Sequence, residues 1–212
     1  DGENRFGPDT LIDSDSSTTK TALGSSKINS DEIKYLTWIS IIRLGLVQMA
    51  LGSVVVLTTS TLNRLMVVEA SLPAIIPGLL VGLHYGVQIT RPAWGFFSDK
   101  GSNRTKWILQ GMVVLASGGV MATVGVVIIG DHLIIGLLLS TIAYTLIGLG
   151  VGASGTSLLA LLATATKPQR RAAAASTTWL MMVFGIALTA GIVGSLIDPY
   201  SPLRLITIVV IV

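Results

Sequence analysis

The feature that most constrains this chain is a series of apolar stretches, mostly of about 20 residues or more, of which the complete ones are uncharged except for Arg43 in the first. A bilayer core is about 30 Å thick and is crossed by about 20 apolar residues of helix, so each stretch predicts a membrane-spanning helix. Five stretches are complete and a sixth begins near the end of the sequence, at 36–62, 70–90, 107–130, 133–166, 172–197 and 203–212. We therefore expect an all-α fold, a polytopic transmembrane helix bundle over 36–212.

The polar and apolar parts of the chain are separated along the sequence. Of the 212 residues, 51% are hydrophobic and 12% are charged, and the first 35 are rich in Ser, Thr, Asp and Gly. Residues 1–35 lack an apolar period, which predicts a flexible polar tail, and they show no secretory signal pattern. Because 205–212 is too short to cross a bilayer, we expect the chain to be part of a longer protein.

The positions of the basic residues predict the topology of the spans. Bases gather in the tail and in the connections at 91–106 and 167–171, whereas Arg64 and Arg204 lie in the opposite connections. The positive-inside rule then makes the amino-terminal tail and the two base-rich connections cytoplasmic. The net charge of +3 is explained by these flanking loops. We accordingly expect membrane lipid as a partner and no nucleic acid.

The sequence offers little for catalysis. It contains no cysteine, which excludes disulfides, zinc-thiolate sites and iron–sulfur clusters. It also lacks an HExxH motif, a phosphate-binding GxxxxGK[ST] motif and any carboxylate within the spans. We expect a protein that is not an enzyme and binds no free metal ion. Ordinary proton coupling in this half of the protein is also poorly supported.

Glycines and prolines within the apolar stretches predict close packing and helix starts. Gly148 and Gly152 have the small-xxx-small spacing that lets helix backbones approach closely in a membrane. Pro73 and Pro77 open the second stretch, where a missing amide donor costs little. The alternative is that glycine is simply common in membrane helices.

A polar loop follows the second stretch and has a distinctive spacing of Gly95, Asp99, Lys100, Gly101 and Arg104. A carboxylate and nearby bases in such a loop can bind helix ends and each other across the cytoplasmic face, as a latch. The loop resembles the signature of the major facilitator superfamily, except that its second Gly follows the Asp after two residues rather than three. An ordinary positive-inside loop is the alternative interpretation.

Three further segments resemble the PucC-type light-harvesting assembly proteins, a branch of that superfamily. They are Ile42-Arg43-Leu44-Gly45-Leu46-Val47-Gln48, then 61–69 with Pro73-Ala74, then 168–172 followed by 179–185. A Leu-Gly-Trp-Arg-Arg stretch found in many such proteins is absent, which suggests a subgroup.

The resemblance implies a twelve-helix, two-lobed fold of which this chain is the amino-terminal lobe. It further implies a bacterial inner, intracytoplasmic photosynthetic membrane, with antenna or reaction-centre polypeptides and pigments as partners. Bacteriochlorophyll and carotenoid are the expected cofactors. The expected function is to assist assembly of a light-harvesting or reaction-centre complex, or to form part of one. The alternative is a secondary transporter of a small solute.

Polar side chains inside the apolar stretches are costly, so each is a candidate binding residue. His84 could ligate the magnesium of a bacteriochlorophyll, or could instead hydrogen-bond a neighbouring helix or relay protons. Gln88 lies one turn later on the same face, and Gln48 is a possible partner across a cavity. Arg43 could bind an anionic head group or a pigment acid, or could extend to the interface. We expect His84, Gln88, Gln48 and Arg43 to be the pigment-binding residues.

Overall fold

The structure of the protein is a computed structural model that describes residues 35–100 and 103–211. The predicted flexible tail lies outside the described residues except for Tyr35, and so does Gly101 of the predicted latch loop. Within the described ranges all regular elements are helical and none is a strand, which confirms the predicted all-α fold class.

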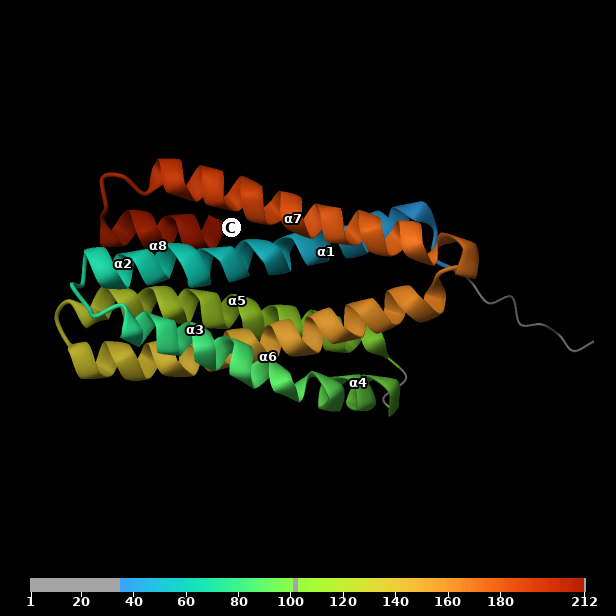
Figure 1. Cartoon of the computed structure of the whole chain (residues 1–212), viewed down its shortest axis with the longest axis horizontal. Helices are drawn as coiled ribbons and strands as arrows, with labels where there is room; N and C mark the ends of the chain where they lie inside the picture. The colour runs from blue at the N-terminus through green and yellow to red at the C-terminus, as the bar shows by residue number, and fades with distance from the viewer. Residues whose placement is uncertain (1–34, 101–102, 212) are drawn as a thin grey trace, which may run out of the picture. The chain divides into compact units, whose positions relative to one another are not determined.

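The elements follow one another in the order shown in Figure 1. They are α1 (Trp38–Val56), the π-helix η1 (Leu57–Leu62), α2 (Asn63–Val68), α3 (Ile75–Val87), the 3-10 turn η2 (Gln88–Thr90), α4 (Arg91–Lys100), α5 (Arg104–Ile129), α6 (Leu133–Ala165), the 3-10 turn η3 (Pro168–Arg170), α7 (Arg171–Leu196) and α8 (Pro202–Ile211).

Four helical runs of the described part are long and apolar enough to cross a membrane. They are Trp38–Val68, Arg104–Ile129, Leu133–Ala165 and Pro168–Leu196. The last three begin and end within four residues of the stretches predicted from sequence, and the first continues six residues further than predicted. The protein is therefore a multi-pass membrane protein.

The stretch predicted at 70–90 differs from the other spans. Its helix α3 has only 13 residues and continues through η2 into the polar helix α4. The chain reaches α3 through a turn in which Ser71 has a φ of 51°, and Pro77 lies in the first turn of the helix. The polar residues His84, Gln88 and Arg91 reduce the apolar character of this run. A complete span at this place stays a prediction.

Side chains at the helix starts explain two of the boundaries. Thr37 precedes α1 and accepts a hydrogen bond from the Ser40 amide at 3.3 Å. Asn103 precedes α5 and accepts from the Lys106 amide at 3.4 Å. Both satisfy an amide that has no partner within the helix, so both fix where a helix begins.

The helices pack in pairs within this bundle (Figure 1). α5 lies along α6 and α1 lies along α7, while α3 crosses α6 and α8 packs on α5. Glycines bring α5 and α6 together, since a Cβ added at Gly111 would lie 2.7 Å from the Ser154 amide nitrogen. Lipid supplies no hydrophobic drive between helices, so such close van der Waals contact holds the pair.

The core and the outer face of the bundle are both apolar. Leu115, Tyr144 and Ile147 are completely buried between the helices. Leu138 on α6 and Leu180 on α7 are 62% and 66% exposed. A continuous apolar exterior is unfavourable in water and suits a helix that faces lipid.

Candidate functional site

His84 lies near the carboxyl-terminal end of α3 and is completely buried. α3 crosses α6 at Gly148, where an added Cβ would lie 2.6 Å from the His84 carbonyl oxygen. Because only glycine lets the two backbones come this close, Gly148 sets the depth of the imidazole in the bundle. The prediction that small residues of α6 permit a close approach is confirmed at this position.

A chain of hydrogen bonds runs along one face of the α3–η2–α4 run. The Nη2 of Arg91 donates to the Oε1 of Gln88, and the Nε2 of Gln88 lies 2.9 Å from the Nε2 of His84. The three side chains are four and three positions apart, which places them on one helix face. Sequence reasoning used Arg91 only for topology, although its spacing from His84 and Gln88 was a signal that it belongs to the site.

The donors and acceptors of this chain fix the tautomer of His84. A guanidinium has only donors, so Gln88 presents its oxygen to Arg91 and its nitrogen to the imidazole. An amide nitrogen donates and has no free lone pair, so the Nε2 of His84 accepts. The ring is therefore neutral and carries its proton on Nδ1. Within the described residues this Nδ1 is buried and has no hydrogen-bond partner.

Gln48 approaches the same region from α1. Its side chain is buried, and its Oε1 has no hydrogen-bond partner among the described residues. Gln48, His84, Gln88 and Arg91 all line one cavity of 360 Å³, whose remaining wall is mostly apolar and comes from α1, α3, α6 and α7. An apolar cavity with a few converging polar groups is the usual form of a small-molecule site.

Arg43 does not belong to this cavity. It is exposed on α1 and lines a separate cavity of 210 Å³ beside Thr105 and Leu161. Arg43 and Gln48 are five positions apart, which turns their side chains about 140° away from each other around the helix. The structure thus brings together three of the four predicted pigment-binding residues and places Arg43 elsewhere.

The hydrogen bonds of His84 do not suit the predicted magnesium ligation. A metal ligand needs a nitrogen with a free lone pair. The lone pair of Nε2 accepts the Gln88 amide proton, and Nδ1 carries a proton. The arrangement suits hydrogen bonding to a ligand instead.

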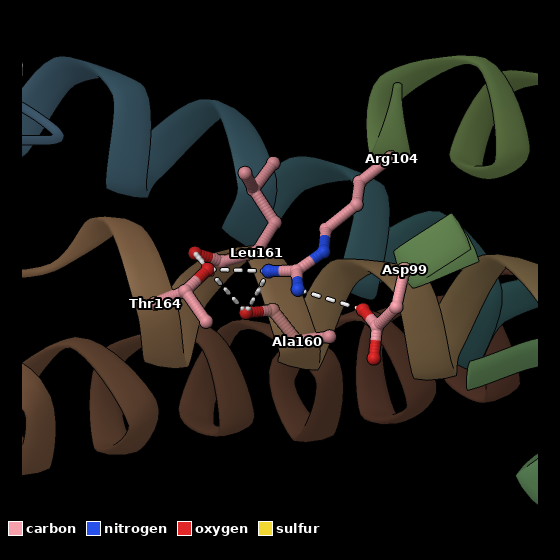
Figure 2. Close-up of polar contacts among 5 residues, drawn as sticks. All are labelled: Asp99, Arg104, Ala160, Leu161 and Thr164. Atoms are coloured by element: carbon pink, nitrogen blue, oxygen red, sulfur yellow. Dashed lines mark hydrogen bonds and ion pairs between the residues drawn. The ribbon is translucent and has the colours of Figure 1, made fainter. Parts of the chain in front are cut away.

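The predicted latch residues Asp99 and Arg104 form an ion pair between the end of α4 and the start of α5 (Figure 2). The Nη2 of Arg104 lies 2.7 Å from the Oδ1 of Asp99, and Nη1 donates to the Ala160 carbonyl at 3.0 Å and to the Thr164 hydroxyl. Ala160 and Thr164 lie in the last two turns of α6, and the Thr164 hydroxyl also donates to the Ala160 carbonyl at 2.9 Å. A cation at this end also opposes the helix dipole favourably.

The other latch residues in the described part have less specific surroundings. A Cβ added at Gly95 would make an ordinary contact of 3.6 Å with Thr156, so this glycine is not needed for close approach. Lys100 is exposed at the end of α4. Trp94 of α4 and Trp107 of α5 lie 5.8 Å apart between ring centroids.

Comparisons with known proteins give several relatives. Bacteriochlorophyll synthase 44.5 kDa chain of Rhodobacter capsulatus is 65% identical over 177 residues, which cover 84% of this chain and 41% of that protein. Protein PucC of Rhodobacter capsulatus is 27% identical over 181 residues, which cover 80% of this chain and 39% of that protein. Protein PucC of Cereibacter sphaeroides is 26% identical over 181 residues, with the same coverage. No solved structure matches the chain.

The chain spans about two fifths of the length of these curated relatives. A family model described as PUCC protein matches residues 61–212, which is well over half of the chain. The matched region includes the α3–η2–α4 run, the latch residues and all of α5, α6 and α7. On this match the chain belongs to the PUCC protein family.

Proposed function

We propose that this chain is the amino-terminal part of a membrane protein that assists assembly of, or forms part of, a bacterial light-harvesting or reaction-centre complex. The observation that carries the proposal is the PUCC family match over 61–212. The name of the relative that is 65% identical refers to bacteriochlorophyll, which supports a pigment as ligand. Antenna or reaction-centre polypeptides are the proposed protein partners. The transporter alternative has the fold as its sole support.

The proposed role is binding and not catalysis. The relative from Rhodobacter capsulatus carries the word synthase in its name, which describes that protein. In the cavity of this chain the polar groups are a neutral imidazole, two amides, a guanidinium, a phenol and an indole. Within the described part no carboxylate, serine or threonine lines it. These groups can orient a ligand by hydrogen bonds but offer neither an activated nucleophile nor a carboxylate base.

The proposed location is the intracytoplasmic photosynthetic membrane, with the amino terminus in the cytoplasm. The positive-inside rule supports this orientation, because the α4–α5 connection carries Lys100, Arg104 and Lys106. The Asp99–Arg104 pair then fastens this connection to the cytoplasmic end of α6. Bacteriochlorophyll, or a related tetrapyrrole, is the proposed cavity ligand, and a carotenoid remains a prediction from family resemblance.

The test is deletion of the gene in its own photosynthetic host, followed by near-infrared absorbance of isolated membranes. We expect the antenna or reaction-centre bands to fall by severalfold and to return when the full-length gene is supplied. Immunoblots with an epitope tag show that the supplied protein is present. Unchanged bands in the deletion strain would overturn an assembly or subunit role. Co-purification of antenna polypeptides in mild detergent would separate a stable subunit from a transient factor.

A further inference from the structure

The cavity between α1, α3, α6 and α7 contains two buried polar atoms that no protein group satisfies. These are the Nδ1 of His84 and the Oε1 of Gln48, and neither has a hydrogen-bond partner among the described residues. Both residues line the same cavity of 360 Å³. A buried polar group without a partner is costly, because it has lost its hydrogen bonds to water and gained none in return. Such groups in one cavity indicate that a ligand supplies the missing partners.

The proton on Nδ1 makes His84 a donor toward this ligand. The lone pair of Nε2 accepts the Gln88 amide, and Arg91 holds that amide in its orientation. Gln48 is adaptable, because no hydrogen bond within the described part fixes its amide, which can turn either its oxygen or its nitrogen toward a ligand. The site can therefore present two donors to one region of a ligand.

We propose that His84 recognises an oxygen atom at the edge of an apolar ligand through its Nδ1–H, with Gln48 as a second hydrogen-bonding group, and that His84 does not coordinate a metal. The class of ligand rests on the proposed function, namely a tetrapyrrole with peripheral carbonyl groups. The cavity is smaller than a whole tetrapyrrole with its hydrocarbon tail and is not fully enclosed. It therefore takes the carbonyl-bearing edge of the ring while the remainder extends outward.

Access to the two atoms needs a local side-chain movement, since both are covered in this structure. Met182 of α7 also lines the cavity, and its thioether chain is adaptable because it has three rotatable bonds and no branch. A change of its rotamer requires no movement of the backbone contact between α3 and α6 at Gly148.

The first experiment measures the tautomer directly. The full-length protein is labelled with ¹⁵N-histidine, and the His84 signals are assigned by difference from His84→Asn. We expect a protonated Nδ1 and an unprotonated Nε2, and we expect Gln88→Leu to shift the balance toward a proton on Nε2. A wild-type proton on Nε2, which leaves Nδ1 free to bind a metal, would overturn the proposal whatever the outcome of the gene deletion.

The second experiment compares binding of bacteriochlorophyll a and bacteriopheophytin a, its metal-free counterpart, to the full-length protein in detergent. We expect dissociation constants within about threefold of each other. His84→Leu should weaken both by about tenfold, whereas His84→Asn, which keeps a donor near the Nδ1 position, should weaken them less. His132→Leu, at an exposed position before α6, is the matched control and should bind as the wild type does.

Three outcomes would contradict the proposal. Binding of the metal-containing pigment alone would show that His84 or another group coordinates the metal. Equal binding by His84→Leu and the wild type would remove His84 from the site. Binding of neither pigment by the wild type would overturn the ligand proposed here, and a successful gene complementation in that case would leave the assembly role standing.

Discussion

Gly148 shows how the absence of one methyl group positions a functional side chain. The His84 carbonyl oxygen occupies the space where a Cβ of residue 148 would lie, so α3 rests directly on the backbone of α6. The imidazole is thereby buried deeply enough for its Nε2 to meet Gln88 and for its Nδ1 to lie without a protein partner. Burial, tautomer and ligand preference at His84 all depend on this contact.

We expect Gly148→Ala to destabilise the protein by about 1 to 3 kcal/mol, because the new methyl group overlaps backbone that cannot move independently. Gly155→Ala on the same helix is the matched control. A Cβ there meets nothing within 4 Å, so the gain in helix propensity makes it neutral or slightly stabilising. Denaturant unfolding of both variants in one detergent measures the difference, and equal stabilities would contradict the close contact.

Arg104 combines an exposed ion pair with hydrogen bonds to a helix end. Its side chain is 23% exposed and that of Asp99 is 59% exposed, so the ion pair alone is worth at most about 1 kcal/mol. We expect Asp99→Asn to cost less than that and Arg104→Ala to cost about 1 to 2 kcal/mol, since the Ala160 and Thr164 acceptors are also lost. Lys100→Gln is the control for Arg104→Ala, because it also removes one positive charge. Thermal unfolding measures the loss of stability in each variant. A larger loss in Asp99→Asn than in Arg104→Ala would refute this assignment.

The residues of the site were partly predictable. Gln48, His84 and Gln88 stand out in the sequence because polar groups within apolar stretches are costly, and the structure places all three on one cavity. Arg43 satisfies the same criterion but faces another side of α1, because its separation from Gln48 does not match the helical period. Arg91 follows Gln88 by three positions, which matches the helical period. Its role in orienting the Gln88 amide, however, is shown only by the hydrogen bond between the two side chains.

At the scale of elements, the π-helix η1 interrupts the first membrane-spanning run. A change from α to π hydrogen bonding leaves carbonyl groups without their usual partners. The hydroxyl of Tyr144, from α6, donates to the Thr58 carbonyl at 2.7 Å in the buried core. This bond satisfies the interrupted segment and ties α6 to the first run.

We expect Tyr144→Phe to destabilise the protein by about 1 to 3 kcal/mol, because the Thr58 carbonyl would remain buried without its side-chain donor. Tyr85→Phe is the control of identical chemistry, since Tyr85 is 54% exposed and its hydroxyl forms no hydrogen bond within the described part. Urea unfolding followed by far-ultraviolet circular dichroism compares the two variants. A loss of stability in Tyr85→Phe as large as in Tyr144→Phe would contradict a specific role for the buried bond.

The bounds of the long helices follow closely from hydropathy, whereas the irregular elements do not. α6 was predicted at 133–166 and runs from Leu133 to Ala165, because lipid requires every backbone group in a span to be paired within the helix. The π-helix η1 has no such signal in the hydropathy, and the bond to its Thr58 carbonyl comes from Tyr144, in a distant part of the chain. The late start of α3 similarly reflects the turn at Ser71.

At the scale of the whole molecule, the charge distribution predicts which connections face the cytoplasm. These 212 residues contain no cysteine. In a full-length protein with any remaining cysteines replaced by serine, a single introduced cysteine therefore reports one side of the membrane. We expect Lys100→Cys, in the cytoplasmic connection, to react with a membrane-impermeant maleimide only in inside-out vesicles. His132→Cys, before α6, should react only in right-side-out vesicles or intact spheroplasts. Reaction of both residues from the same side would contradict the proposed topology.

The sequence by itself determined that this chain is an all-α membrane bundle and where its long helices lie. It also determined which polar residues lie inside the apolar stretches. Those conclusions depend on local composition, because the bilayer imposes a length and an apolar character on each span separately. Tertiary structure alone decided that Gln48 and His84 line the same cavity and that Arg43 lines another. It also decided that Arg104 binds the end of α6. Such contacts depend on helix rotation and crossing, which are set by small residues at the interfaces and not by hydropathy.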